Sequence, residues 1–316
     1  MLSQYPSPAG LPAALHSGAL DFKPILLEDA GHFAKYFSCQ TFRTCDYSVG
    51  AVYQWRAYFD TYYTVYADML LQIACYEDSE YCYAFPAGPG DMDAALSAIE
   101  TDAAARGLPL VFCFVPEEAL PVLKTRYGED IDITSHRDWA DYLYLAEGLK
   151  TFAGKKYHGQ KNHLNRFVKD HPGYAYVPVT RDNYETARDF LRAFKKETDL
   201  SEPIKQEEIT RAQELLRDHF DLVLEAGYIE WNGEVIALSI GEIIGDTLFC
   251  HVEKAKREHA GAYQAIVSEF AKAVCREDTL YINREDDSGE EGLRASKMAY
   301  QPLKLLPKYW VRIPCR

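Results

Sequence analysis

One order of predicted secondary-structure elements occurs twice along this chain, and it limits the possible folds more than any other feature. In each half, an apolar strand and a helix precede three strand-like segments, and a helix, a strand, a short helix and a last strand follow. The first copy spans about 22–147 and the second about 174–313. A length of 316 residues also suits two domains. The sequence therefore predicts an α+β protein made of two units of one architecture.

Turn residues support this interpretation in the second half. The dipeptides Asn232-Gly233 and Gly245-Asp246 are typical of two-residue hairpin loops, because both central positions of such loops favour Gly, Asn or Asp. They divide residues 226–255 into three strands. We therefore expect an antiparallel meander here, with a helix on either side of it in the sequence.

The composition narrows the class of protein. Apolar residues make up 47% of the chain and charged residues 26%, as in ordinary soluble globular proteins. No stretch of about 18 uncharged apolar residues occurs, and the N-terminus lacks a signal-peptide pattern, so neither a membrane span nor secretion is predicted. The eight cysteines are scattered without a CxxC pair, which fits free thiols in a reducing cytoplasm.

Positive charge is concentrated near the middle of a chain whose net charge is −14. The stretch GKKYHGQKNHLNRFVKD at 154–170 predicts a helix whose Tyr157, Leu164, Phe167 and Val168 pack inward. A second face holds Lys155, Gly159, Asn162 and Arg166. Its polar side chains, together with the neighbouring Lys156, could meet phosphate or carboxylate. A solvated linker helix would carry the same charges. His158 and His163 are five residues apart, so no metal site is predicted.

A second polar segment, INREDDSGEEGLRASKMAYQP at 282–302, follows a predicted strand. Asp286 and Asp287 lie at a turn, and Arg294 and Lys297 follow on one face of a short helix that ends near Tyr300. Carboxylates that face cations at the end of a strand suit deprotonation of an amine and binding of an anionic donor. A salt-bridged helix terminus is the alternative.

The duplicated order of elements resembles that of the GCN5-related N-acetyltransferase (GNAT) fold, which implies two tandem GNAT domains. Each would be a mixed, mostly antiparallel sheet flanked by helices. In this fold the loop after the meander and the next helix N-terminus hold the pyrophosphate of the donor through backbone N–H groups. The resemblance therefore implies a donor-binding role for residues of the loop EKAKREHAGAY, namely Lys254, Lys256, Arg257, Gly261 and Ala262. Ala260 stands where the family pattern has glycine.

Two motifs carry a more specific resemblance. Asp286 followed by GLRASKMAYQP is similar to the D…GLR-x-x-K-x-x-[FY]-x-P ending of the C-terminal catalytic domain of bacterial phosphatidylglycerol lysyltransferases. The stretch GKKYHGQKNHLNRF resembles the basic helix that opens the second GNAT unit of that domain. The resemblance covers roughly 20–312, and it implies a first domain at 1–148, degenerate in function, and a second domain at 149–316 with the active site.

The resemblance also implies a reaction. An acyl- or aminoacyl-transferase would move an activated group from acyl-CoA or aminoacyl-tRNA to the amine or hydroxyl of a small-molecule, lipid or peptide acceptor. Asp286 or Asp287 would act as base, with Glu242 and Glu253 in reserve, and Tyr300 would protonate the leaving group. Arg294 and Lys297 would hold the donor or the oxyanion. Direct transfer requires only positioning and proton transfer, and no metal is expected.

Two other functions fit the same scaffold. One is a non-catalytic sensor that binds an aminoacyl or nucleotide ligand, and the other is a peptidyltransferase of the Fem type. Between the two donors, the lysyltransferase likeness favours aminoacyl-tRNA, whereas the GNAT architecture favours coenzyme A. A net charge of −14 argues against a wide tRNA footprint, although a local basic groove could bind an acceptor stem.

Overall fold

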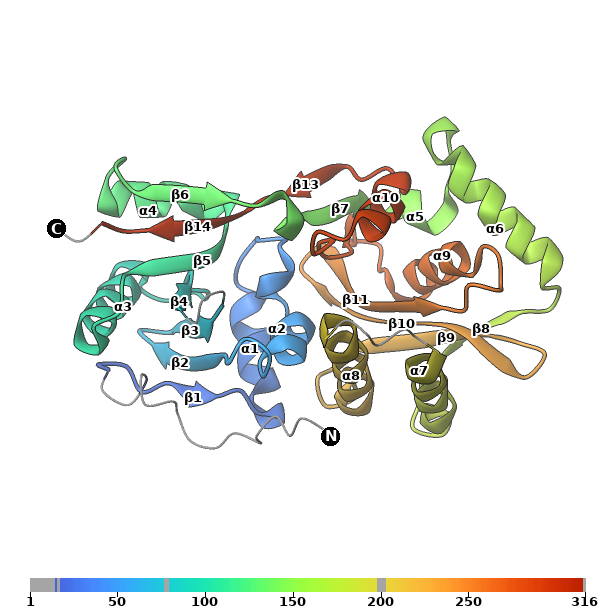
Figure 1. The fold of residues 1–316 in the computed structure, drawn as a ribbon, viewed down its shortest axis with the longest axis horizontal. Helices are drawn as coiled ribbons and strands as arrows, with labels where there is room; N and C mark the ends of the chain where they lie inside the picture. The colour runs from blue at the N-terminus through green and yellow to red at the C-terminus, as the bar shows by residue number, and fades with distance from the viewer. Residues whose placement is uncertain (1–14, 16–17, 77–79, 198–202, 315–316) are drawn as a thin grey trace. The chain divides into compact units, whose positions relative to one another are not determined.

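The computed structural model describes residue 15 and residues 18–76, 80–197 and 203–314 (Figure 1). Cys315 and most of the N-terminal stretch in which no signal peptide was predicted lie outside these residues. The chain divides into two compact units, one of Met1–Trp139 with Pro307–Arg316 and the other of Ala140–Leu306. No helix of the described residues is both long enough and apolar enough to cross a bilayer.

Unit 1 contains a seven-stranded sheet in the order β1-β2-β3-β4-β5-β14-β6. All neighbouring strands are antiparallel except β4 and β5, which are parallel. Asp91 accepts a hydrogen bond from the backbone N–H of Ala94 and caps α3, and Gly107 ends that helix with a φ of 68°. The strands are β1 (Lys23–Pro24), β2 (Tyr62–Tyr66), β3 (Met69–Cys75), β4 (Tyr81–Ala84), β5 (Val111–Pro116), β6 (Asp132–Ser135) and β14 (Lys308–Arg312), and the helices are α1 (Ala30–Phe37), α2 (Val49–Trp55), α3 (Met92–Arg106) and α4 (Leu120–Tyr127).

Unit 2 contains a second seven-stranded sheet in the order β13-β7-β12-β11-β10-β9-β8. Its parallel pair is β11 and β12, and the other pairs are antiparallel. The strands are β7 (Asp141–Leu145), β8 (Ala175–Pro178), β9 (Glu225–Trp231), β10 (Glu234–Ile244), β11 (Thr247–Ala255), β12 (Tyr281–Asn283) and β13 (Lys304–Leu306). Both predicted hairpin turns join strands of the β9–β11 meander, and Asn232 and Gly233 have φ values of 52° and 78°.

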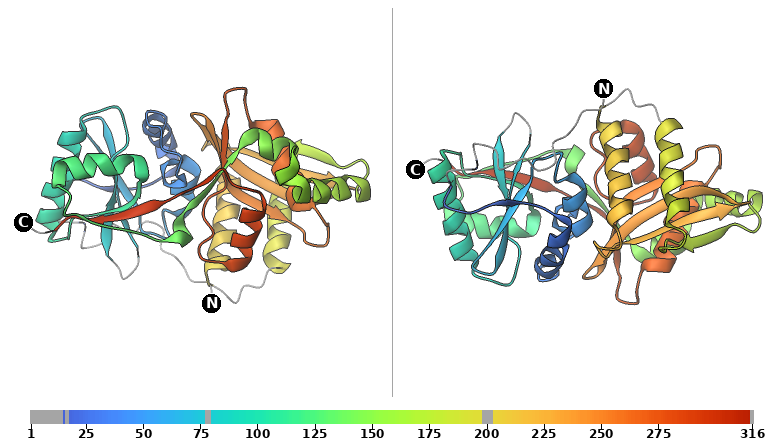
Figure 2. Two further views of the ribbon diagram at one scale, coloured as in Figure 1. Left: turned by 90° about the horizontal axis from the view of Figure 1, so that it is seen from above. Right: turned by 90° about the horizontal axis from the view of Figure 1, so that it is seen from below.

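Helices cover both faces of this second sheet. Figure 1 shows α9 on one face and α7 and α8 on the other, and the right-hand view in Figure 2, seen from below, looks onto α7 and α8 in front of the strands. Apolar side chains of α5, α6 and α9 pack with those of the strands into one buried core, which includes Leu149, Phe167 and Ile266. The helices are α5 (Ala146–Thr151), α6 (His158–Asp170), α7 (Tyr184–Glu197), α8 (Pro203–Asp218), α9 (Ala262–Val274) and α10 (Glu291–Ala299).

The architecture confirms the predicted α+β fold of tandem GNAT type, with one exchange of strands that the element order did not indicate. Strand β7, expected to close the first half, pairs with β12 and β13 in the second sheet. Strand β14, expected to end the second half, pairs with β5 and β6 in the first. The compact units therefore divide after Trp139 rather than at 148, and the last residues belong to unit 1.

Candidate functional site

The candidate site of unit 2 lies where β11 and β12 separate. The two strands pair in parallel from Thr247 to Phe249 on β11 and from Tyr281 to Asn283 on β12. Strand β11 continues to Ala255, whereas β12 ends at Asn283. Ligands of open α/β sheets bind where the carboxyl ends of neighbouring strands part, so side chains just beyond this point are the first to consider.

Arg284, the first residue after β12, reaches across to Glu253 on β11. Its Nε and Nη2 atoms lie 2.8 and 2.6 Å from Oε2 of Glu253. The guanidinium lies over the ring of Tyr300, 4.3 Å from its centroid. All three side chains are largely removed from solvent. This ion pair fixes the guanidinium in one orientation beside the aromatic ring.

Two hydrogen-bond donors at this point have no partner among the described residues. They are Nη1 of Arg284 and the hydroxyl of Tyr300, and both atoms are buried. Burial raises the pKa of Tyr300, so this hydroxyl keeps its proton. Buried donors without acceptors are uncommon because each costs about 1–3 kcal/mol. An acceptor oxygen placed beside this pair could therefore receive a hydrogen bond from each donor.

A buried histidine bridges two carboxylates in the same region. His251 on β11 lies 3.0 Å from Glu242 of β10 through Nε2 and 2.9 Å from Glu285 through Nδ1. Burial alone would lower the pKa of His251, but the hydrogen bonds to the two carboxylates raise it from 6.5 to about 9. A protonated imidazole thus joins β10, β11 and the segment after β12.

The two predicted catalytic aspartates have different surroundings. Asp287 is completely buried; it accepts hydrogen bonds from Tyr142 at 2.5 Å and from Nε and Nη2 of Arg294 at 3.1 and 2.8 Å. Asp286 is half-buried, and its Oδ1 accepts hydrogen bonds from the backbone N–H and the hydroxyl of Ser288, both at 3.0 Å. Asp287 therefore anchors Arg294 of α10, while the carboxylate of Asp286 stays in contact with solvent.

Lys297 of α10 holds the backbone of the same segment. Its buried ammonium donates hydrogen bonds to the carbonyl oxygens of Arg284, at 2.6 Å, and of Asp286. Burial lowers the pKa of Lys297. Of the predicted catalytic residues, Asp287 and Arg294 thus form an ion pair, and Lys297 is directed at carbonyl groups of the chain. Tyr300 lies against Arg284 instead.

The cations predicted to bind the donor in the loop after β11 are partly engaged elsewhere. Lys254 lies 2.5 Å from Glu208 of α8, and Lys256 lies 2.5 Å from Glu234 of β10. Arg257 is exposed to solvent. Binding of a phosphate by either lysine would have to compete with these ion pairs.

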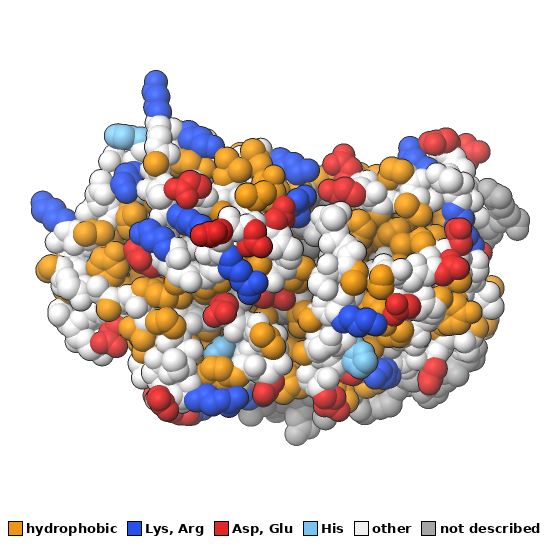
Figure 3. Space-filling model, turned by 180° about the vertical axis from the view of Figure 1, so that it is seen from behind, with side chains coloured by type: hydrophobic (Ala, Val, Ile, Leu, Met, Phe, Trp, Pro, Cys, Tyr) orange, Lys and Arg blue, Asp and Glu red, His pale blue; other side chains and the backbone are white. Residues whose placement is uncertain are grey.

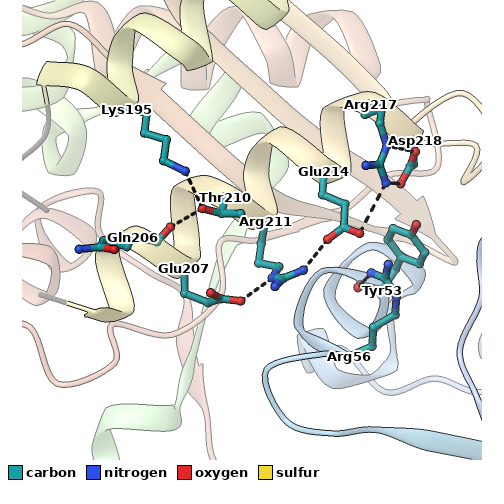
Figure 4. Close-up of polar contacts among 10 residues, drawn as sticks. All are labelled: Tyr53, Arg56, Lys195, Gln206, Glu207, Thr210, Arg211, Glu214, Arg217 and Asp218. Carbon is teal, nitrogen blue, oxygen red and sulfur yellow. Dashed lines mark hydrogen bonds and ion pairs between the residues drawn. The ribbon is translucent and has the colours of Figure 1, made fainter. Parts of the chain in front are cut away.

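Helix α8, the partner of Lys254, carries a row of ion pairs (Figure 4). Arg211 lies between Glu207, at 2.5 Å, and Glu214, at 2.7 Å, and Arg217 reaches Glu214 and Asp218. Those of the pairs that lie three or four residues apart stabilise the helix. Glu208 of this stabilised helix is the residue that pairs with Lys254 of β11.

Gly261 and Ala262 lie at the start of α9, where α6 approaches closely. Gly261 caps α9 with a φ of 88°, and a Cβ atom there would overlap the carbonyl oxygen of His163 and lie 3.0 Å from Cβ of Phe167. Ala262 is buried. Glycine is required at 261 because the backbones of α6 and the α9 N-terminus are in contact.

Helix α6 and the 3-10 turn before it, Lys155–Tyr157, present their charges to solvent. Tyr157, Leu164 and Phe167 are buried, and the predicted binding residues Lys155, Lys156, Asn162 and Arg166 are exposed. Lys and Arg side chains stand out from the margin of unit 2 at which α6 lies (Figure 3). Val168, expected to pack inward, is 46% exposed. The buried stripe instead includes Gln160, which accepts a hydrogen bond from Gln264 of α9 and donates one to the carbonyl of Ala299.

Comparison with known proteins identifies the family. The family model described as phosphatidylglycerol lysyltransferase, C-terminal, matches residues 40–312. The chain belongs to this family. The match covers most of the chain and includes both motifs on which the sequence resemblance depended.

Solved structures and one curated relative extend this result. A conserved protein of unknown function from Bacteroides thetaiotaomicron is 33% identical, with a TM-score of 0.86 over 93% of this chain and 100% of that chain. L-PGS from Bacillus licheniformis shares the fold at 15% identity, with a TM-score of 0.57 over 81% and 85% of the two chains. An uncharacterised protein of Mycoplasmoides gallisepticum is 25% identical over 195 residues, and the match spans 61% of each protein.

In this member of the phosphatidylglycerol lysyltransferase C-terminal family, sequence reasoning missed three residues of the buried network: His251, Arg284 and Glu285. A signal was present, because His251 and Glu253 alternate on a strand whose first half, residues 248–250, is apolar. Arg284 and Glu285 also directly follow the short strand β12. Charged residues at such positions need partners, and this points to a site.

Replacement of Gly261 by alanine tests the contact between α6 and α9. Gly261→Ala should lower the free energy of unfolding by at least about 2 kcal/mol, because the left-handed backbone strain adds to overlap with α6. Gly154→Ala is the matched control, since Gly154 also has a positive φ, 95°, but no atom near the added Cβ. Equal losses in urea unfolding of the two variants would contradict a close contact at Gly261.

The bridge at His251 predicts a dependence of stability on pH. A histidine whose pKa rises on folding stabilises the protein fully below the unfolded value of 6.5, and this contribution is lost as the pH rises through about 9. The loss should amount to about 3 kcal/mol across this interval. Urea unfolding of the wild type and of His251→Gln at several pH values measures it. If the free energy of unfolding fell equally with pH in both proteins between pH 6.5 and 9, the raised pKa would not belong to His251.

Proposed function

We propose that unit 2 is an aminoacyltransferase site that moves an aminoacyl group from aminoacyl-tRNA to an amine or hydroxyl acceptor. Membership of the family and the GNAT-like fold support transfer of an acyl or aminoacyl group. The observation that carries the proposal is the pair of buried donors without partners, Nη1 of Arg284 and the hydroxyl of Tyr300. Donors that are fixed before the reaction and face a developing oxyanion are the main requirement for acyl transfer.

In this proposal, Arg284 and Tyr300 hold the carbonyl oxygen of the aminoacyl ester as it becomes an oxyanion. Their positions are supported by Glu253, which orients the guanidinium, and by Lys297, which fixes the carbonyl of Arg284. Asp286, half-exposed at the edge of the site, accepts the proton of the attacking amine or hydroxyl. As the oxyanion returns to a carbonyl, the Tyr300 hydroxyl gives its proton to the departing ribose oxygen, and the proton taken up by Asp286 then restores the tyrosine.

The donor is assigned from α6. Arg166 lies on this helix and pairs with Asp170 at 3.4 Å, while Lys155 and Lys156 lie in the 3-10 turn just before it. All three side chains are exposed, and the helix backbone contacts the start of α9 at Gly261, the place where GNAT-type folds hold phosphates. The loop lysines that would meet coenzyme A instead form ion pairs with Glu208 and Glu234. A helix with exposed basic residues fits the backbone of an acceptor stem better than a single pyrophosphate.

The family is named for transfer of lysine to phosphatidylglycerol, and we extend only the reaction class to this chain. Unit 2 rather than unit 1 is assigned the chemistry because Asp91 occupies the N-terminus of α3 in unit 1. A carboxylate there would repel a phosphate. Unit 1 is accordingly proposed to be structural.

A binding and transfer assay tests the function. The protein is incubated with aminoacyl-tRNAs charged with radioactive amino acids, with uncharged tRNA and with acyl-CoAs, and thermal shift and release of the label to added acceptors are measured. We expect charged tRNA to raise the melting temperature of the protein and its radioactive label to appear on the acceptor. A response to acyl-CoA alone would replace the donor assignment, and binding without transfer to any amine or hydroxyl would favour a sensor.

The basic face of α6 gives a sharper prediction for the donor. Replacement of Lys155, Lys156 and Arg166 by alanine should weaken tRNA binding and reduce the slope of log K against log salt by about one for each phosphate that is no longer neutralised. Turnover at saturating donor should change little. Lys124→Ala, an exposed lysine of unit 1 paired with Glu129, is the control. An unchanged salt slope would place the tRNA elsewhere.

A further inference from the structure

Unit 1 contains a buried lysine beside a cysteine, apart from the candidate active site. Lys308 of β14 is 2% exposed, and its ammonium donates to Sγ of Cys45 at 3.2 Å and lies 3.0 Å from Oδ2 of Asp46. The ring centroid of Phe114 is 5.5 Å away. A buried ammonium is costly unless it is paired, so Asp46 explains its charge state. It does not explain why the ammonium also meets a thiol.

Cys45 differs from other buried thiols of unit 1. Cys82 and Cys113 face the carbonyl oxygens of Ala74, at 3.7 Å, and Tyr83, at 3.5 Å, and burial raises the pKa of Cys82. At Cys45 the ammonium beside the sulfur favours the thiolate, the carboxylate of Asp46 within 4.8 Å opposes it, and the direct contact with an amine is what sets this thiol apart. Cys45 also retains 7% exposure, against 1% for Cys82, and the side chain of Asp46 is 25% exposed. A small oxidant can therefore approach from the side of Asp46.

We propose that Cys45 and Lys308 form a redox-controlled covalent cross-link, with hydrogen peroxide as the oxidant. The thiolate of Cys45 attacks one peroxide oxygen and becomes a sulfenic acid; the O–O bond breaks, and the other oxygen takes a proton from the ammonium of Lys308 and leaves as water. The neutral amine of Lys308 then attacks the sulfur. An S–N bond forms, the S–O bond breaks, and a second water leaves. The thiol is oxidised by two electrons and the peroxide is reduced by two.

The geometry favours capture of the sulfenic acid over further oxidation. Lys308 is fixed on a strand that pairs with β5 opposite Pro116 and with β6 through the residues that follow, and its amine already contacts the sulfur. The linked residues are 263 positions apart in sequence but belong to the same compact unit. A cross-link over so long a loop restricts the unfolded chain, so the melting temperature should rise by several degrees.

Peptide mass spectrometry of the wild-type protein provides the test. After limited treatment with hydrogen peroxide, digestion should yield one species that joins the peptides of Cys45 and Lys308 and has lost two hydrogens. Addition of a thiol reductant should regenerate the separate peptides. A joined species that carries one further oxygen has consumed a second peroxide, and its formation in place of the species that lost only two hydrogens would overturn the proposed S–N bond. The exposed Cys39 is the internal reference for the extent of oxidation.

Variants separate the roles of the two side chains. Cys45→Ser and Lys308→Met should each abolish the joined species, and Lys308→Arg should keep the charge without forming it. Oxidation of Cys39 in the wild type without a joined species would overturn the proposal, as would conversion of Cys45 to a sulfinic acid alone. Because the decisive measurement uses the wild-type protein, a variant that fails to fold does not obscure the result.

Discussion

Arg284→Met should destabilise the protein by about 3–5 kcal/mol and abolish transfer activity. The substitution keeps much of the side-chain volume but leaves the carboxylate of Glu253 largely buried and without its cation, and an uncompensated buried charge is the costly case. It also removes the Nη1 donor assigned to the oxyanion. Urea unfolding measures the first effect and the transfer assay the second.

A double variant separates stability from function. Arg284→Met combined with Glu253→Leu replaces the ion pair by apolar side chains and should recover most of the lost stability, because such replacements are often close to neutral. Activity should not return, since the donor is still missing. Recovery of activity together with stability would show that Arg284 acts only through folding.

Tyr300→Phe should reduce turnover about a hundredfold to a thousandfold while leaving the protein as stable as the wild type, or more stable by about 1 kcal/mol. These opposite signs follow from one observation. The hydroxyl of Tyr300 is buried without a hydrogen-bond partner among the described residues, so its removal breaks no hydrogen bond there, whereas the proposed transition state needs it. The change in turnover is measured at saturating donor, and the change in the free energy of unfolding is measured by urea unfolding.

Tyr157 provides the matched control. Its hydroxyl is also buried without a hydrogen-bond partner among the described residues, but it lies at the start of α6. Tyr157→Phe should therefore have the same effect on stability and none on turnover. A loss of activity in both variants, or in neither, would remove Tyr300 from the proposed site.

Local sequence signals predicted much of the fold. Alternating apolar residues and the turn at Asn232-Gly233 defined the meander, and Asp91 and Gly107 marked the two ends of α3. Helix α2 (Val49–Trp55) was missed, because seven residues without a side-chain cap leave little periodicity to detect. The exchange of β7 and β14 was also missed, because strand pairing is a long-range property that residue patterns do not encode.

The candidate site was predicted in part for a similar reason. The motif at 282–302 placed Asp286, Asp287 and Arg294 in one segment, and the structure shows them close together. The pairing of Arg284 with Glu253 joins residues 31 positions apart, and that of His251 with Glu285 joins residues 34 apart. Only the parallel register of β11 and β12 brings these partners together, and no short motif contains it.

The position of β14 has a consequence for synthesis of the protein. This strand lies inside the first sheet, between β5 and β6, and it consists of residues 308–312. Until residues 308–312 leave the ribosome, the edges of β5 and β6 that β14 will occupy are left without their partner, although the rest of unit 1 has long emerged. Unpaired edges of this kind invite association with other chains. Unit 1 is therefore begun before unit 2 but completed only after every strand of unit 2 has been made.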